Sequence, residues 1–184
     1  SRRQRLHVFA LGNRGMTARW GLAVLLTIAA PAAAGEPASP IAAAPAPSLA
    51  AWHGTWVGEG TAFGKAASAT LAIGPATEGD ATALSYQLAI PGTPAVGYGA
   101  EAIYRVDGKG RVRGSWTDNM GRTRPVGGRL AVSEWVNVWG SADVEIGRST
   151  YVLEAPDRLL VSDSVLQDNG SWRVFATLRF QRKP

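Results

Sequence analysis

Acidic residues on candidate strands are the side chains best suited to acid–base chemistry in this sequence. Four of them stand in segments where apolar and polar residues alternate: Glu101, Glu134, Glu145 and Asp163. Two carboxylates brought together inside a closed sheet would repel each other, which raises the pKa of one and prepares it to donate a proton. The alternative is that these acids face water, as most acidic side chains do. The sequence therefore permits an acid–base pair, but it does not indicate which two of these acids would form it.

Asp118 and His53 are two further polar candidates. Asp118 closes a candidate strand and shares a face with Trp116. It is either a turn cap that bonds its own backbone or a polar contact at the mouth of a pocket. His53 is the only histidine from residue 35 onward. It is either a hydrogen-bonding residue at the surface or end of the fold, or a general base, which would need an orienting carboxylate.

Aromatic residues with a period of two are typical of a core face or of a pocket lining. Six of the seven tryptophans lie after residue 50, and Trp135, Asn137 and Trp139 share one face of a candidate strand. A cavity in a barrel would be lined by such a face, with a few polar groups to orient a ligand. The residues that we expect to bind a ligand are Tyr86, Tyr104, Trp116, Asp118, Trp135 and Tyr151.

The composition excludes several classes of chemistry. The chain has no cysteine, which excludes disulfides, thiolate metal sites, iron–sulfur clusters and cysteine nucleophiles. It has only two histidines, and no grouping of residues indicates a metal site. Residues 58–64 (GEGTAFG) lack the strand before and the helix after that a nucleotide-binding loop requires. We expect neither a metal nor a cofactor.

The net charge of +5 originates in the first 34 residues. They contain five arginines and no acid, whereas residues 35–184 contain 14 basic and 14 acidic side chains. No basic surface remains to bind nucleic acid. Residues 20–30 (WGLAVLLTIAA) form an apolar run too short to span a membrane, and alanines at 32–34 provide a cleavage site. We expect residues 1–34 to be a signal peptide, with residues 1–15 either part of it or an untranslated extension before Met16.

The remaining chain predicts a linker followed by one β domain. Residues 35–50 (GEPASPIAAAPAPSLA) are rich in proline and alanine, which is typical of a semi-rigid linker, so the folded domain spans 51–184. Turn residues separate short alternating segments at the spacing of a sandwich or barrel. Every connection is short enough for a hairpin, which favours a single all-β, up-and-down antiparallel barrel of about 9–10 strands over a sandwich. The expected strands lie near 54–63, 67–74, 82–90, 98–107, 111–118, 123–132, 134–140, 143–154, 158–167 and 171–182.

One hairpin can be given a register. A three-residue loop at 108–110 with a left-handed glycine at its end pairs residues whose numbers sum to 218. Tyr104 then lies opposite Gly114 on an apolar core face. Arg105 lies opposite Arg113 on the other face, which is either a solvated outer wall or an anion site. In the last segment, alternation predicts one apolar inward face made of Trp172, Val174, Ala176, Leu178 and Phe180.

Two short motifs resemble calycin barrels. Residues 54–60 (GTWVGEG) contain the Gly-x-Trp found near the first strand of lipocalins and their relatives, where the tryptophan plugs one end of the barrel, and also resemble the opening of nitrobindin-like heme barrels. Residues 104–110 (YRVDGKG) and 114–118 (GSWTD) are similar to a family of uncharacterised secreted bacterial proteins with a calycin-like fold. The resemblance implies such a barrel over most of 52–183. Nitrobindin-like barrels bind heme through a histidine near the C-terminal end, which this chain lacks, so Tyr86, Tyr98, Tyr104 or Tyr151 would have to serve.

The leading functional expectation is an exported barrel, periplasmic or secreted, that binds a small and largely apolar molecule and is not an enzyme. Once the signal is removed, no stable membrane span remains, and no nucleic-acid partner is expected. One alternative is an envelope interaction or structural barrel with a filled core. The other is a barrel-type isomerase or hydrolase with Glu101 or Asp118 as base and an arginine or tyrosine as electrophile, which requires an interior carboxylate of raised pKa.

Overall fold

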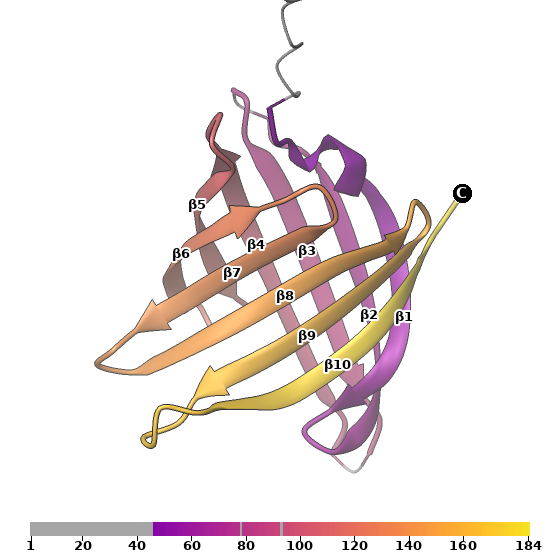
Figure 1. Ribbon diagram of the computed structural model, residues 1–184. Helices are drawn as coiled ribbons and strands as arrows, with labels where there is room; N and C mark the ends of the chain where they lie inside the picture. The colour runs from indigo at the N-terminus through magenta and orange to yellow at the C-terminus, as the bar shows by residue number, and fades with distance from the viewer. Residues whose placement is uncertain (1–45, 78, 93) are drawn as a thin grey trace, which may run out of the picture. The chain divides into compact units, whose positions relative to one another are not determined.

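The computed structural model describes residues 46–77, 79–92 and 94–184, which form a closed antiparallel barrel of ten strands preceded by a 3-10 helix (Figure 1). Each strand pairs with the next, and β1 pairs with β10 to close the sheet. The prediction of an all-β up-and-down barrel is confirmed, whereas the expected signal peptide and residues 35–45 of the linker lie outside the described residues. The elements are η1 (Leu49–Trp52), β1 (Gly54–Ala62), β2 (Lys65–Pro75), β3 (Thr82–Ile90), β4 (Val96–Val106), β5 (Arg111–Asp118), β6 (Thr123–Leu130), β7 (Glu134–Ser141), β8 (Glu145–Ala155), β9 (Arg158–Leu166) and β10 (Trp172–Arg182).

The β4–β5 hairpin has the register that the sequence predicts. Tyr104 lies opposite Gly114 and Arg105 opposite Arg113, while Gly110 adopts a left-handed φ of 73°. A Cβ atom at Gly114 would collide with the carbonyl oxygen of Ile103 and stand 2.8 Å from the Tyr104 ring. Glycine is therefore what lets the tyrosine ring lie across the neighbouring strand. The two arginines lie on the exposed outer wall.

The predicted inward face of β10 is wrong for its first two residues. The ladder between β9 and β10 shifts between Val174 and Ala176, and the extra residue of this β-bulge reverses the phase of the strand. Phe175 packs against the core in place of Val174, which is 59 % exposed. Trp172 lies with its ring 4.5 Å from the Arg148 guanidinium. Alternation breaks at this point, since Val174, Phe175 and Ala176 are three apolar residues in a row, but the break alone does not determine which of them points inward.

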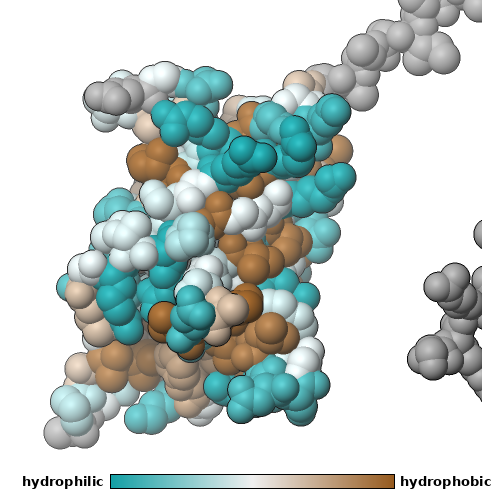
Figure 2. All heavy atoms as spheres, turned by 90° about the vertical axis from the view of Figure 1, so that its left-hand side faces the viewer, coloured by the Kyte–Doolittle hydropathy of each residue, from teal (hydrophilic) through white to brown (hydrophobic). Residues whose placement is uncertain are grey.

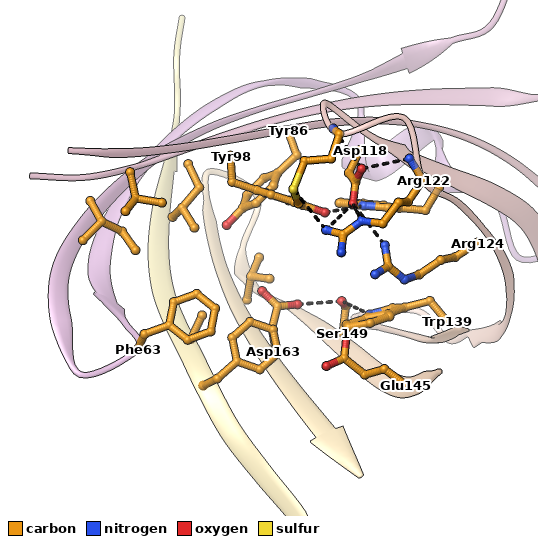
Figure 3. Close-up of a pocket in the computed structure, with 18 of the residues that line it drawn as sticks. Phe63, Tyr86, Tyr98, Asp118, Arg122, Arg124, Trp139, Glu145, Ser149 and Asp163 are labelled. Atoms are coloured by element: carbon orange, nitrogen blue, oxygen red, sulfur yellow. Dashed lines mark hydrogen bonds and ion pairs between the residues drawn. The ribbon is translucent and has the colours of Figure 1, made fainter. Parts of the chain in front are cut away.

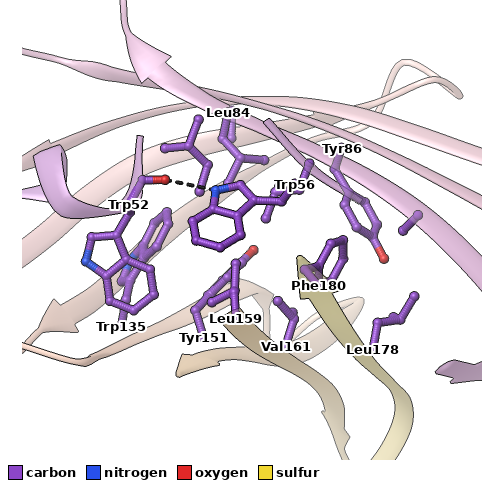
Figure 4. Packing of buried hydrophobic residues seen from close by; sticks show 14 of the residues in the cluster. Trp52, Trp56, Leu84, Tyr86, Trp135, Tyr151, Leu159, Val161, Leu178 and Phe180 are labelled. Carbon is purple, nitrogen blue, oxygen red and sulfur yellow. Dashed lines mark hydrogen bonds between the residues drawn. The ribbon is translucent and has the colours of Figure 1, made fainter. Parts of the chain in front are cut away.

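Helix η1 closes one end of the barrel. Leu49 and Trp52 are buried there, although Leu49 lies within the expected linker. The Trp56 indole nitrogen donates a hydrogen bond to the Trp52 carbonyl oxygen at 3.0 Å, and the Arg182 guanidinium lies 4.0 Å from the Trp56 ring. Trp52 meets the ring of Trp135 edge-on at 6.1 Å (Figure 4). This half of the barrel is filled with large side chains.

The opposite end carries exposed apolar side chains at its turns. Phe63, Val96, Met120 and Val144 come from four different hairpins there, and each is at least half exposed. Figure 2 shows apolar atoms between polar ones on the side formed by β5 to β7, and they gather toward the lower part of that face. Among the described residues, no helix is long and apolar enough to cross a membrane.

Candidate functional site

A cavity of about 270 Å³ lies in the half of the barrel opposite η1 (Figure 3). Small side chains on its walls, such as Ala176 and Ser149, leave the space that large residues fill near η1. Its aromatic lining consists of Phe63, Tyr86, Tyr98, Trp116, Trp139, Tyr151 and Phe175. Its charged and hydroxyl lining consists of Asp118, Arg122, Arg124, Glu145, Ser149 and Asp163. The result is an apolar chamber with polar groups at a few fixed places.

Four of the six residues expected to bind a ligand line this cavity, and the other two do not. Tyr86, Trp116, Asp118 and Tyr151 belong to its wall. Tyr104 and Trp135 point into the barrel as well, but they pack edge-on in the closed half, with ring centroids 4.9 Å apart. Tyr151 stacks on Trp135 at 4.6 Å and forms the boundary between core and cavity. Alternation predicts on which face of a strand a side chain lies. Whether an aromatic ring reaches the cavity depends instead on its position along the barrel axis.

Asp118 caps the β5–β6 turn and also lines the cavity, so both interpretations of this residue apply. One oxygen accepts hydrogen bonds from the backbone N–H groups of Met120 and Arg122, each at 3.0 Å. The other accepts from Arg122 Nε at 2.9 Å and from Arg124 at 3.2 Å. Burial would raise the pKa of Asp118, but the hydrogen bonds from Arg122, Arg124 and Met120 outweigh it and lower the pKa to about 2. The lowered pKa and the four hydrogen bonds disfavour Asp118 as a general base.

Asp163 is the enclosed carboxylate of the cavity. It accepts a hydrogen bond from the Ser149 hydroxyl at 2.6 Å, and that hydroxyl accepts one from the Trp139 indole at 3.1 Å. Burial raises the pKa of Asp163 to about 6. The hydrogen bond from Ser149 lowers this pKa, but by less than burial raises it. The side chain therefore changes its charge just below neutral pH, inside an apolar chamber.

The other acids do not form an enclosed pair with Asp163. Glu101 lies exposed on the outer wall, where Ser85 donates a hydrogen bond to it at 2.7 Å. The expectation of Glu101 as an interior base is wrong, because alternating residues of β4 face outward in the register that pairs it with β5. Glu134 is exposed at the start of β7, near the closed end. Glu145 is exposed and stands at the mouth of the cavity.

Two tyrosine hydroxyls belong to the same chamber. Tyr98 accepts a hydrogen bond from the Trp116 indole at 2.8 Å. Tyr86 is 7 % exposed, and its buried hydroxyl has no hydrogen-bond partner in the described part of the chain. Burial and then the negative charge of Asp163 raise the pKa of Tyr86. An unpartnered hydroxyl in a binding cavity is available to a ligand.

His53 lies at the closed end, away from this cavity. Burial, and after it the positive charge of Arg182, lower the pKa of His53. Its carbonyl oxygen accepts a hydrogen bond from Arg182, so the local contacts are structural. In the described ranges, no three histidine or acidic side chains are grouped to hold a metal ion.

Several cavity residues escaped the sequence analysis for identifiable reasons. Tyr98 shares the inward face of β4 with Tyr104, and Arg124 lies opposite Trp116, so a fuller use of strand register finds both. Phe63 occupies a turn with a left-handed φ of 52°, which is unusual for a residue other than glycine. Phe175 enters the cavity through the bulge, and it stacks on Phe63 with ring centroids 5.0 Å apart. Phe63 has no signal in the alternation pattern, whereas Phe175 stands in the apolar run 174–176 that interrupts it.

The fold and the cavity define a class of protein: a closed up-and-down β-barrel with an internal chamber at one end. Its closed ring of ten antiparallel strands is consistent with a calycin-like fold. No protein-family model matches the chain, and no curated protein sequence matches it.

Proposed function

We propose that this protein is an exported barrel that binds a small, largely apolar molecule in its internal cavity. The observation that carries the proposal is the cavity of about 270 Å³, which is surrounded by aromatic and aliphatic side chains in a barrel whose other half is tightly filled. Binding cavities of small-molecule carriers are lined in this way, with a few polar groups that fix orientation. The signal sequence expected at residues 1–34 supports export, to the periplasm or the medium.

The lining favours an apolar body for the ligand. Rings such as Trp116 and Phe175 offer broad apolar surface, and each Å² of apolar area removed from water contributes about 25 cal/mol. Arg122 and Arg124 share the single carboxylate of Asp118 in ion pairs at 2.9 and 3.2 Å, so that cluster keeps one net positive charge, while most of the lining is apolar. An apolar molecule of modest size therefore gains most from this chamber.

Retained ligand is the first test of the proposal. The protein is purified after expression with its own leader, and its native mass is compared with its denatured mass. We expect a stoichiometric excess in the native spectrum. Ala176→Phe fills the cavity from β10 and should abolish the excess, whereas Val132→Phe, at a position 95 % exposed near the closed end, should keep it.

A fluorescence titration provides the second test. The tryptophans Trp116 and Trp139 line the cavity, so a bound apolar dye such as N-phenyl-1-naphthylamine should quench them by energy transfer. Saturable quenching in the wild type and in Val132→Phe, but not in a folded Ala176→Phe variant, supports binding in the cavity. Equal quenching in all three proteins, or none in any, would contradict it. Thermal unfolding of each variant verifies that it is folded.

A second candidate function is a barrel-type isomerase or hydrolase, and the enclosed Asp163 is the observation that favours it. A carboxyl group of pKa about 6 is suited to exchange protons near neutral pH, and the Tyr86 hydroxyl would supply a hydrogen bond to a substrate oxygen. The test is deuterium incorporation into 2-indanone in heavy water, compared between wild type and Asp163→Asn. Equal rates in the two proteins would exclude this function of Asp163.

A further inference from the structure

The inner wall of the cavity contains an acid and a hydroxyl with unused hydrogen-bonding capacity. Within the described residues, Ser149 is the only side chain that donates a hydrogen bond to Asp163, and it uses Oδ1. The buried hydroxyl of Tyr86 has no partner in the same part of the chain. Figure 3 shows Tyr86 and Asp163 on facing walls of the cavity, Tyr86 on β3 and Asp163 on β9. The same cavity is therefore lined, on facing walls, by an acceptor and a hydroxyl that have hydrogen-bonding capacity left.

The charged groups of the lining are unevenly placed. Asp118 pairs with both Arg122 and Arg124, which leaves that cluster with one net positive charge, whereas Asp163 forms no ion pair within the described residues. The groups that face Asp163 are neutral hydroxyl or apolar side chains. Ser149 and Tyr151 face it from β8, Ala176 from β10, and Tyr86 and Tyr104 from β3 and β4. No cation of the described chain compensates this carboxylate, and a buried charge without a partner is costly.

We propose that Asp163 and the Tyr86 hydroxyl bind the ammonium group of a small amine whose apolar body fills the rest of the cavity. This inference rests on the proposed binding function and specifies its ligand class. The free oxygen Oδ2 of Asp163 and the hydroxyl oxygen of Tyr86 accept hydrogen bonds from the amine, which has N–H donors and no acceptor when protonated. The ammonium group of the ligand thereby provides a positive charge beside Asp163, where the described residues place none.

The aromatic lining fits the same ligand class. Tyr86 stands edge-on to Tyr98 at 6.3 Å and tilted to Trp116 at 6.1 Å, so two further aromatic rings lie beside it in the cavity wall. Ring faces attract ammonium groups, and their contribution grows when water is excluded. An anionic group placed against Asp163 would be repelled by its carboxylate.

The test compares two probes that differ in one functional group. 3-Phenylpropan-1-amine and 3-phenylpropan-1-ol share their apolar skeleton, and only the amine is charged. Isothermal titration calorimetry at pH 7.5 should show that the wild type binds the amine about tenfold or more tightly than the alcohol, as expected for hydrogen bonds to a charged group. At pH 5 the amine remains charged while Asp163 is largely protonated, and the preference should fall.

Two substitutions with the same change of charge localise the effect. Asp163→Asn should remove the preference for the amine and keep the affinity for the alcohol. Asp143→Asn is the matched control, because Asp143 is exposed in the β7–β8 turn and does not line the cavity. It should keep the preference. Tyr86→Phe should weaken amine binding more than alcohol binding.

The outcomes separate this inference from the proposed function. If both probes bind with equal affinity in the wild type, the amine inference is overturned and the binding function stands. If neither probe binds, both are overturned. If Asp143→Asn reduces the preference as much as Asp163→Asn does, net charge rather than the Asp163 site is responsible, and the inference is again overturned.

Discussion

The half-buried carboxyl group of Asp163 should make the stability of the ligand-free barrel depend on pH. Its pKa rises from 3.8, the ordinary value, to about 6 in the fold, because burial disfavours the charged form. Between these two pH values the folded state holds a proton that the unfolded state has released. The wild type therefore loses stability as the pH rises through this window, and the loss is complete above pH 6.

The size of the effect follows from the difference between the two pKa values. Each unit corresponds to about 1.4 kcal/mol, so ionised Asp163 costs the fold about 3 kcal/mol at pH 8 relative to pH 3. Asparagine retains a similar shape and cannot ionise. Relative to the wild type, Asp163→Asn should therefore gain about 3 kcal/mol of unfolding free energy between pH 3 and pH 8.

Urea unfolding of the wild type and of Asp163→Asn at several pH values measures this difference directly. Contributions from other groups, including Asp118, are common to both proteins and cancel in the comparison. A difference between the wild type and Asp163→Asn that stays constant with pH would refute the reasoning, because it would show that burial does not perturb this carboxyl group.

Three further predictions concern single side chains of the barrel. Asp118→Asn should lower the unfolding free energy, measured with urea at pH 7, by about 2 kcal/mol, because four donors lose a charged acceptor. This loss should shrink as the pH falls from 3.8 to about 2, because the wild-type carboxylate is protonated in that range. Tyr86→Phe should raise the unfolding free energy of the ligand-free protein by about 1 kcal/mol, because it removes a buried hydroxyl without a partner; a loss of stability would show that the hydroxyl is satisfied. Gly114→Ala should cost about 3 kcal/mol through the collision with the Ile103 carbonyl, whereas Gly108→Ala in the same hairpin meets no atom within 4 Å and should be tolerated; similar melting temperatures would contradict the packing argument.

The hairpin around residue 109 illustrates what local sequence information can predict. A glycine-containing loop admits few geometries, and a one-residue slip would turn every core residue outward. The pairing of Tyr104 with Gly114 and the exposure of Arg105 follow from these two constraints alone. The same reasoning on register, applied to the next hairpin, predicts that Arg124 lies opposite Trp116.

The site was less predictable because its position depends on depth within the barrel. Trp135 and Trp139 share one strand face, yet the first packs on Trp52 in the closed half and the second lines the cavity. Asp163 was one of four candidate acids, and the sequence analysis did not separate it from the three that proved exposed. Its distinction is that β8, β10 and the facing β3 surround it with side chains that have no positive charge.

By itself, the sequence determined the class of fold, the order of the strands and the face of most residues. These properties follow from alternation and turn residues, which act over a few positions along the chain. Only the tertiary structure decided that η1 fills one end, that a bulge turns Phe175 inward, and that Tyr86 and Asp163 line one cavity. Burial and pKa are set by groups that closure of the barrel brings together from distant strands, and no local pattern encodes their distance.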